Sequence, residues 1–135
     1  RDKYVYRPEP VKVLAKIDSI WRLLKTLEGD IFTDFPKAQK VLKFEIVSVD
    51  GKFQRRGIAQ KLMELTIRNA LQLKFDTITT TATSFKTQEM FKKKLGFRTI
   101  RIIDLRHFEV DGETPFKNIQ LDNLVAKFMI KELSI

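Results

Sequence analysis

Apolar residues recur at steps of three and four positions near the start of the chain. They are Val13, Ile17, Ile20, Leu24 and Leu27. That spacing puts an apolar stripe along one side of an α-helix. Pro10 suits a first helical position and Gly29 a helix stop. The pattern predicts an amphipathic helix between them, with Asp30 capping a short turn-rich segment that ends near Pro36.

The next apolar segment alternates instead. In VLKFEIVSV, residues 41–49, Leu42, Phe44 and Ile46 share one face, and Glu45, Val47 and Val49 share the other. A period of two predicts a strand. The polar turn DGKFQRR follows, and the period then returns to that of a helix from Gly57 to Lys74.

The remaining segments complete an alternating order. Residues 76–83 are rich in β-branched side chains and predict a strand, after which Ser84 caps a helix that ends at Leu95. Residues 98–105 predict another strand, residues 108–116 a loop that turns at Asp111-Gly112, and residues 123–133 a last strand. The sequence has no internal repeat and no linker. The order of its helices and strands predicts one α/β domain, residues 1–135, built on a mixed sheet.

Composition excludes several kinds of site. Hydrophobic residues make up 43% of the 135 positions, which is enough for one core. No apolar run reaches the roughly 20 residues of a membrane span, and no signal region opens the chain. With no cysteine and a single histidine, His107, neither a disulfide framework nor a thiolate or histidine metal site is expected. These features fit a cytoplasmic protein without a metal or a membrane partner.

Charge favours an anionic partner. Lys and Arg total 26 against 17 Asp and Glu, a formal net charge of +9. One basic group surrounds the polar turn, and a second is expected to cluster around the later helix, although such a run is also typical of a solvated face. The first group is Lys52, Arg55, Arg56 and Lys61; the second is Lys86, Lys92, Lys93, Lys94, Arg98 and Arg101.

The turn before Gly57 predicts an anion site. The first N–H groups of a helix have no partner within it, and the helix dipole adds positive potential there. A glycine lets a phosphate approach the main chain closely. Two familiar phosphate loops are excluded by spacing, because Gly51 is followed by Gly57 and Ile58, which fits neither Gly-x-Gly-x-x-Gly nor Gly-x4-Gly-Lys-Ser/Thr. A glycine that only eases a tight turn is the simpler alternative.

The residues Gln54-Arg55-Arg56-Gly57-Ile58-Ala59 fit the Gln/Arg-x-x-Gly-x-Gly/Ala pattern of the GNAT superfamily of N-acetyltransferases. Two longer stretches, DIFTDFPKAQKVLKFEIVSVD and ATSFKTQEMFKKKLGF, resemble the arylalkylamine N-acetyltransferase-like branch of invertebrates. The resemblance covers roughly residues 13–133.

The resemblance implies a GNAT fold with a mixed, mostly antiparallel sheet and flanking helices, and acetyl-CoA as cosubstrate. The strand residues Val47, Ser48 and Val49 would pair with the pantetheine arm, and an N–H near Val47 would hold the oxyanion. The pyrophosphate would rest on the main chain of the turn and the helix start. The residues implied there are Gln54, Arg55, Arg56, Gly57, Ile58, Ala59 and Gln60.

Three residues are candidates for proton transfer from the attacking amine. Glu45 shares a strand face with Val47 and could act as a base, or be a solvated carboxylate paired with Lys43 or Arg98. Ser84 and Thr87 lie where the resembling branch carries hydroxyl residues, and helix capping is their alternative role. The superfamily often has an acidic Tyr on this helix, whereas the nearest aromatic residue here is Phe91.

The chain departs from the family at its front and before Leu95. Family members begin with a strand, two helices and a hairpin, so we expect an N-terminally truncated domain. Three alternatives follow: the chain is a fragment with an intact cofactor half, or another protomer of a homodimer replaces the missing layer, or activity is lost. FKKKLGF is also one residue longer than the usual FxKLGF.

The leading hypothesis is therefore acetyl transfer to a small primary amine, an arylalkylamine or a polyamine. A non-catalytic CoA-binding or interaction module is the alternative. Nucleic-acid binding is not favoured, because no basic-aromatic RNA motif is present.

Overall fold

A computed structural model describes residues 11–44, 57–120 and 124–133; within residues 11–16 only the backbone is described. The elements in chain order are α1 (Val11–Glu28), α2 (Ile31–Asp34), β1 (Val41–Phe44), α3 (Ile58–Gln72), β2 (Thr77–Ala82), α4 (Phe85–Glu89), the π-helix η2 (Met90–Lys94), β3 (Arg98–Asp104), the 3₁₀ helix η3 (Leu105–His107) and β4 (Val125–Glu132). Each predicted helix and strand has a counterpart among these elements, although residues 45–49 of the strand predicted over 41–49 lie outside the described residues. No helix in the described ranges is long and apolar enough to cross a bilayer.

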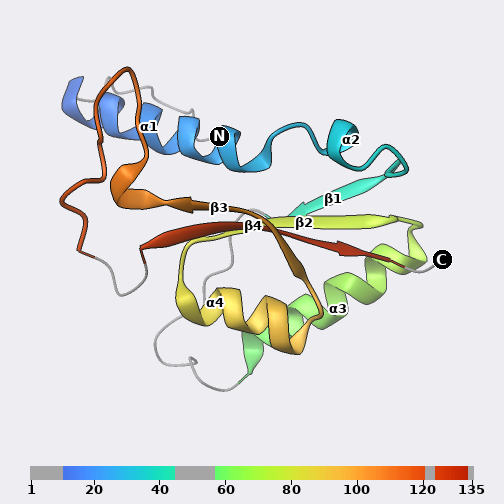
Figure 1. Ribbon diagram of the computed structural model, residues 1–135. Coiled ribbons are helices and arrows are strands. Elements are labelled where there is room, and N and C mark those ends of the chain that lie inside the picture. Colours follow the sequence, from blue (N-terminus) through green and yellow to red (C-terminus); the bar gives the residue numbers. More distant parts are fainter. Residues whose placement is uncertain (1–10, 45–56, 121–123, 134–135) are drawn as a thin grey trace, which may run out of the picture.

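The four strands form one mixed sheet in the order β1-β2-β4-β3. β1 runs parallel to β2, whereas β2 and β3 both run antiparallel to β4. Helices α1 and α2 cover one face, and α3 and α4 cover the other (Figure 1). The predicted α/β fold with a mixed, mostly antiparallel sheet is confirmed.

Strand alternation divides the core between the two faces. Toward α3 and α4, Phe44 of β1 packs with Ile78, Ala82, Met63 and Phe91. Toward α1, Leu23 and Leu27 pack with Leu105, Ala126 and Phe128. The predicted parity of β1 is correct, because Phe44 is buried with Leu42 packed beside it, while Lys43 lies exposed between them.

Gln88 of α4 is the polar tie between that helix and the sheet. Its side chain is only 2% exposed. Its Nε2 donates to the carbonyl oxygens of Ala82 and Val125, at 2.9 Å each. These carbonyls lie where the β2–β4 ladder ends, so the glutamine ties α4 to both strands there.

We expect Gln88→Met to lower the free energy of unfolding by about 2–3 kcal/mol, because two buried carbonyl oxygens lose their donor while the side-chain volume is kept. Urea unfolding measures the loss. Gln72→Met, at the exposed end of α3, is the control and should change stability by less than about 0.5 kcal/mol. Equal losses in both variants would contradict the bridging role.

The extra residue before Leu95 is accommodated by a π-helix. η2 closes with the N–H of Leu95 donating to the Met90 carbonyl, five residues back, at 3.2 Å. A π-turn holds one more residue than an α-turn. As a result Phe91, Leu95 and Phe97 all stay buried, and the Phe91 ring lies 4.8 Å from that of Phe97. The apolar side chains on either side of the π-turn therefore both face the core, and the three lysines between Phe91 and Leu95 are exposed.

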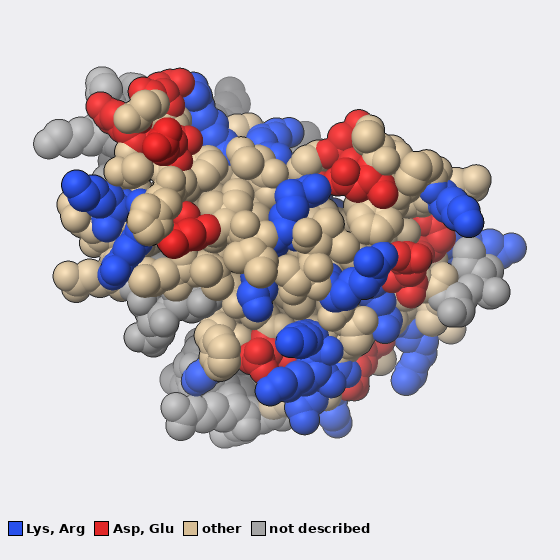
Figure 2. All heavy atoms as spheres, in the orientation of Figure 1, with Lys and Arg blue, Asp and Glu red and all other residues tan. Residues whose placement is uncertain are grey.

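The second basic group does not form one surface. Lys92, Lys93 and Lys94 gather over η2, where Figure 2 shows a dense patch of basic side chains. Arg101 was expected with them, and this was wrong. A bulge between Thr99 and Arg101 sets Arg101 opposite Phe128, on the α1 face of the sheet, where its guanidinium lies 5.3 Å from the Phe128 ring.

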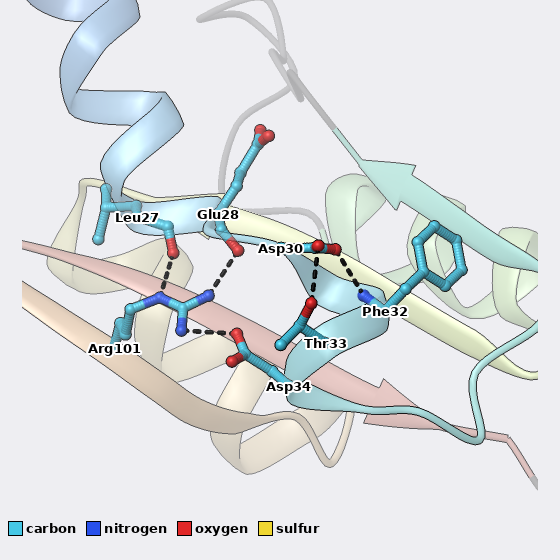
Figure 3. A network of polar contacts seen from close by, with 7 residues as sticks. All are labelled: Leu27, Glu28, Asp30, Phe32, Thr33, Asp34 and Arg101. Carbon is cyan, nitrogen blue, oxygen red and sulfur yellow. Dashed lines mark hydrogen bonds and ion pairs between the residues drawn. The ribbon is translucent and has the colours of Figure 1, made fainter.

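Arg101 caps the carboxyl end of α1. Its Nε and Nη2 donate to the carbonyl oxygens of Leu27 and Glu28, at 2.6 and 2.5 Å, and its Nη1 pairs with Asp34 at 2.8 Å (Figure 3). Helix C-terminal carbonyls have no intrahelical donor, and a cation there also suits the dipole. Asp30 caps α2 as predicted, and the hydrogen bond from the Thr33 hydroxyl lowers the pKa of its carboxyl.

Candidate functional site

The start of α3 is where the sequence predicts an anion site. Gly57 is its N-cap residue and adopts a left-handed conformation, with φ of +71°. It offers no side-chain cap, and a Cβ added to it would meet nothing within 4 Å among the described residues. The Gly57 carbonyl accepts the N–H of Lys61 at 3.0 Å. The N–H groups of the first three helical residues therefore precede the first bond of the α-helical ladder.

Only part of the predicted cofactor set can be placed. Gly57, Ile58, Ala59 and Gln60 form the first turn of α3, where Ile58 is exposed and Ala59 and Gln60 are half-buried. The amide of the Gln60 side chain donates to Glu64 at 3.0 Å, along the helix. The other cofactor residues lie outside the described residues: Val47, Ser48, Val49, Gln54, Arg55 and Arg56.

Of the three proton-transfer candidates, two are described. Ser84 is the N-cap of α4; its hydroxyl accepts the N–H of Thr87 at 3.1 Å and donates to the Thr87 hydroxyl at 3.0 Å. Both side chains thus take part in helix capping. Glu45 lies outside the described residues; of its two suggested partners, Lys43 pairs with Glu28 and Arg98 with Glu132.

A pocket of about 220 Å³ opens on the opposite face of the sheet from α3. One wall is the inner side of α1, and the floor is the carboxyl ends of β1 and β2. Among the described residues, the pairing of those strands extends as far as Phe44 and Thr80, and β2 continues to Ala82. The lining residues are Trp21, Leu24, Lys25, Glu28, Lys43, Phe44, Thr81 and Thr83.

The pocket combines a ring, an ion pair and an unpaired hydroxyl. The Lys25 ammonium lies 5.0 Å from the Trp21 ring centre, and Glu28 forms an ion pair with Lys43. Among the residues that the structure describes, Thr81 Oγ1 is the one buried side-chain polar atom without a hydrogen-bond partner. Buried hydroxyls normally have partners, so this atom is available to a ligand.

Sequence reasoning missed every residue of this pocket. Trp21 and Leu24 read as ordinary positions of an amphipathic helix, and Thr81 as a β-branched strand residue. The strand period shows that Lys43 shares a parity with Glu45, but it shows neither that Thr81 of the next strand lies on the same face nor that α1 crosses above them.

Several solved structures have the same fold as this chain. The chain has a TM-score of 0.76 and 25% identity to arylalkylamine N-acetyltransferase 2 of Aedes aegypti, covering 96% of this chain and 64% of that one. A mosquito arylalkylamine N-acetyltransferase like 5b gives 0.73 and 23%, covering 93% of this chain and 58% of the other. The Drosophila melanogaster polyamine N-acetyltransferase gives 0.73 and 20%, covering 87% and 56%. No curated protein gives a significant match.

The acetyltransferase (GNAT) domain family matches residues 31–111, which is more than half of the chain. The chain belongs to the GNAT acetyltransferase family. In this GNAT domain the matched segment runs from α2 through β3 and so includes the start of α3 and the floor of the pocket. The domain spans about 60% of the length of the solved acetyltransferases that it resembles.

The GNAT domain has Phe91 in its core rather than in a cleft. Phe91 is 1% exposed, and its ring lies 6.2 Å from that of Phe44. A phenyl ring has no proton to give, and this one does not reach solvent. If a thiolate is protonated in this domain, Phe91 does not supply the proton.

Proposed function

We propose that this GNAT domain transfers an acetyl group from acetyl-CoA to a small primary amine. The observation that carries the proposal is the left-handed Gly57 at the start of α3, which has no side chain of its own to cap the first-turn N–H groups. Oriented main-chain N–H groups and the helix dipole suit a diphosphate. The family match supports acetyl-CoA as the diphosphate carrier.

The other cofactor contacts follow from the family pattern. In this proposal Gln54, Arg55 and Arg56 complete the diphosphate site before Gly57, and Ile58, Ala59 and Gln60 contribute their N–H groups. Val47, Ser48 and Val49 pair with the pantetheine arm as an added strand. That places the thioester near the end of β1, beside the pocket that Lys43 and Phe44 line.

The acceptor occupies the α1 pocket and attacks the thioester directly. An alkylamine has a pKa near that of Lys, about 10, and must lose a proton before it attacks. Glu45 is the proposed base, directly or through water, because Lys43, two residues before it, already faces the pocket. Ser84 and Thr87 remain the proposed hydroxyl relay, in addition to their capping of α4. An N–H near Val47 stabilises the oxyanion.

A non-catalytic CoA-binding module is the second candidate function. It is supported by the buried position of Phe91, a residue that has no proton to give. Calorimetry with CoA and an acetyl-transfer assay over a panel of amines separate the two functions. Binding with turnover supports the enzyme, binding without turnover supports the module, and no binding rejects both.

We expect Glu45→Gln to lower kcat about a hundredfold and to remove the ionisation of Glu45 from the pH–rate profile, because an amide cannot accept the amine proton. The affinity for CoA should stay within about twofold. Glu109→Gln, in the exposed loop after η3, is the control. An unchanged rate in the Glu45 variant would remove this residue from the mechanism.

A further inference from the structure

The α1 pocket has an unusual charge balance for a site that receives an amine. Its described lining holds two ammonium groups, of Lys25 and Lys43, and one carboxylate, of Glu28. The carboxylate is already paired with Lys43. Glu45, the proposed base, receives the one ammonium group of the acceptor. An amine with several positive charges then finds no further unpaired carboxylate among the described lining residues.

Lys25 is the cation of this lining with no carboxylate partner in the part of the chain that the structure describes. Its ammonium lies over the Trp21 ring, at 5.0 Å from the ring centre, and the residue is exposed at the mouth of the pocket. A ring face attracts a cation but does not neutralise its charge. Lys25 therefore remains able to bind an anion.

A second donor lies in the same pocket. Thr81 Oγ1 is buried and has no hydrogen-bond partner among the described residues. A hydroxyl can donate to a carboxylate oxygen, and such charge-assisted bonds are stronger than neutral ones. The side chains of Trp21 and Leu24 provide an apolar wall. The volume, about 220 Å³, is below the roughly 300–1,000 Å³ of drug-sized sites, so the acceptor is small.

We infer that the α1 pocket selects an acceptor that carries a carboxylate beside its amine, such as an amino acid with an aromatic side chain, and that Lys25 is the specificity-determining residue. This inference rests on the proposed function, in which the pocket holds the acceptor. Lys25 binds the carboxylate, Thr81 hydrogen-bonds to it, and the apolar wall receives the ring. Polyamines are the least favoured acceptors.

The experiment compares phenylalanine with 2-phenylethylamine, which differ only in the carboxylate. Trp21 is the one tryptophan of the chain, so its fluorescence reports directly on the pocket. The titrations use the full chain saturated with CoA, which carries no acetyl group and so allows no turnover. Spermidine is titrated as the polycation. We expect phenylalanine to bind about tenfold more tightly than phenylethylamine, the size of one charge–charge contact at a partly exposed site.

Lys25→Gln should reduce this preference to less than about twofold, because the charge is lost and most of the stem is kept. Lys94→Gln, an exposed lysine of η2 outside the pocket, should keep it. Thermal melts check that both variants are folded. Equal binding of the two ligands, tighter binding of phenylethylamine, a preference that survives Lys25→Gln, or no response of Trp21 would each overturn the inference.

Failure of the proposed function gives a different result. Calorimetry with CoA and an assay for acetylated product are run on the same samples. If CoA does not bind, the titrations are made on the free chain. A carboxylate preference that depends on Lys25, seen without any product, would support the pocket inference and reject acetyl transfer.

Discussion

Gly57→Glu is expected to weaken CoA binding by about a hundredfold or more. Glutamate places a carboxylate where the diphosphate would lie and removes access to the first-turn N–H groups of α3. Hydrogen bonds to charged groups contribute about 1.5–3 kcal/mol each, so the loss of two accounts for the change. Calorimetric titration with CoA measures it. A retained affinity would reject the start of α3 as the diphosphate site.

The chain offers a matched control at Gly112. It also has a left-handed backbone, with φ of +81°, and a Cβ added there would meet nothing within 4 Å among the described residues. Both Glu variants therefore carry the same backbone penalty, about 1–2 kcal/mol for a non-glycine residue in this region. Only the Gly57 variant should lose CoA. A similar loss in the Gly112 variant would show that general destabilisation, not the ligand site, is responsible.

Arg101→Met is expected to lower the free energy of unfolding by about 2–3 kcal/mol, or roughly 10 °C in Tm. The two carbonyl oxygens at the end of α1 lose their donors, and Asp34 loses its ion-pair partner. Methionine keeps the apolar contact with Phe128. Thermal and urea unfolding measure the effect. A loss below about 0.5 kcal/mol would mean that water replaces the guanidinium.

Arg98→Met is the control, since it removes an arginine of the same strand whose ion pair with Glu132 is exposed. Exposed pairs contribute about 0–1 kcal/mol. Gly29 gives a second, independent measurement. A Cβ at Gly29 would lie 2.6 Å from Arg101 Nη2, on a backbone with φ of +57°. Gly29→Ala should therefore cost less in the Arg101→Met background than in the original chain, and strict additivity would contradict the contact.

Local patterns predicted the elements and the glycine at the start of α3. Period and capping predicted each helix and strand, because a 3.6-residue or two-residue apolar period must face a core in any fold that uses it. The N-cap roles of Asp30 and Ser84 followed from the side-chain chemistry of single residues. Gly57 was identifiable for the same reason, since one short segment contains both the glycine and the helix that it starts.

The α1 pocket and the place of Arg101 could not be predicted in this way. Trp21 and Thr81 are sixty positions apart and meet only because α1 packs across β1 and β2. A bulge in β3 reverses the parity that alternation would give and points Arg101 at α1 instead of α4. The period of a strand fixes which side chains share a face, whereas packing between distant segments fixes what that face meets. For this chain the amino acids alone specify the elements and the glycine turn at the start of α3; the α1 pocket exists only once the sheet and α1 are assembled.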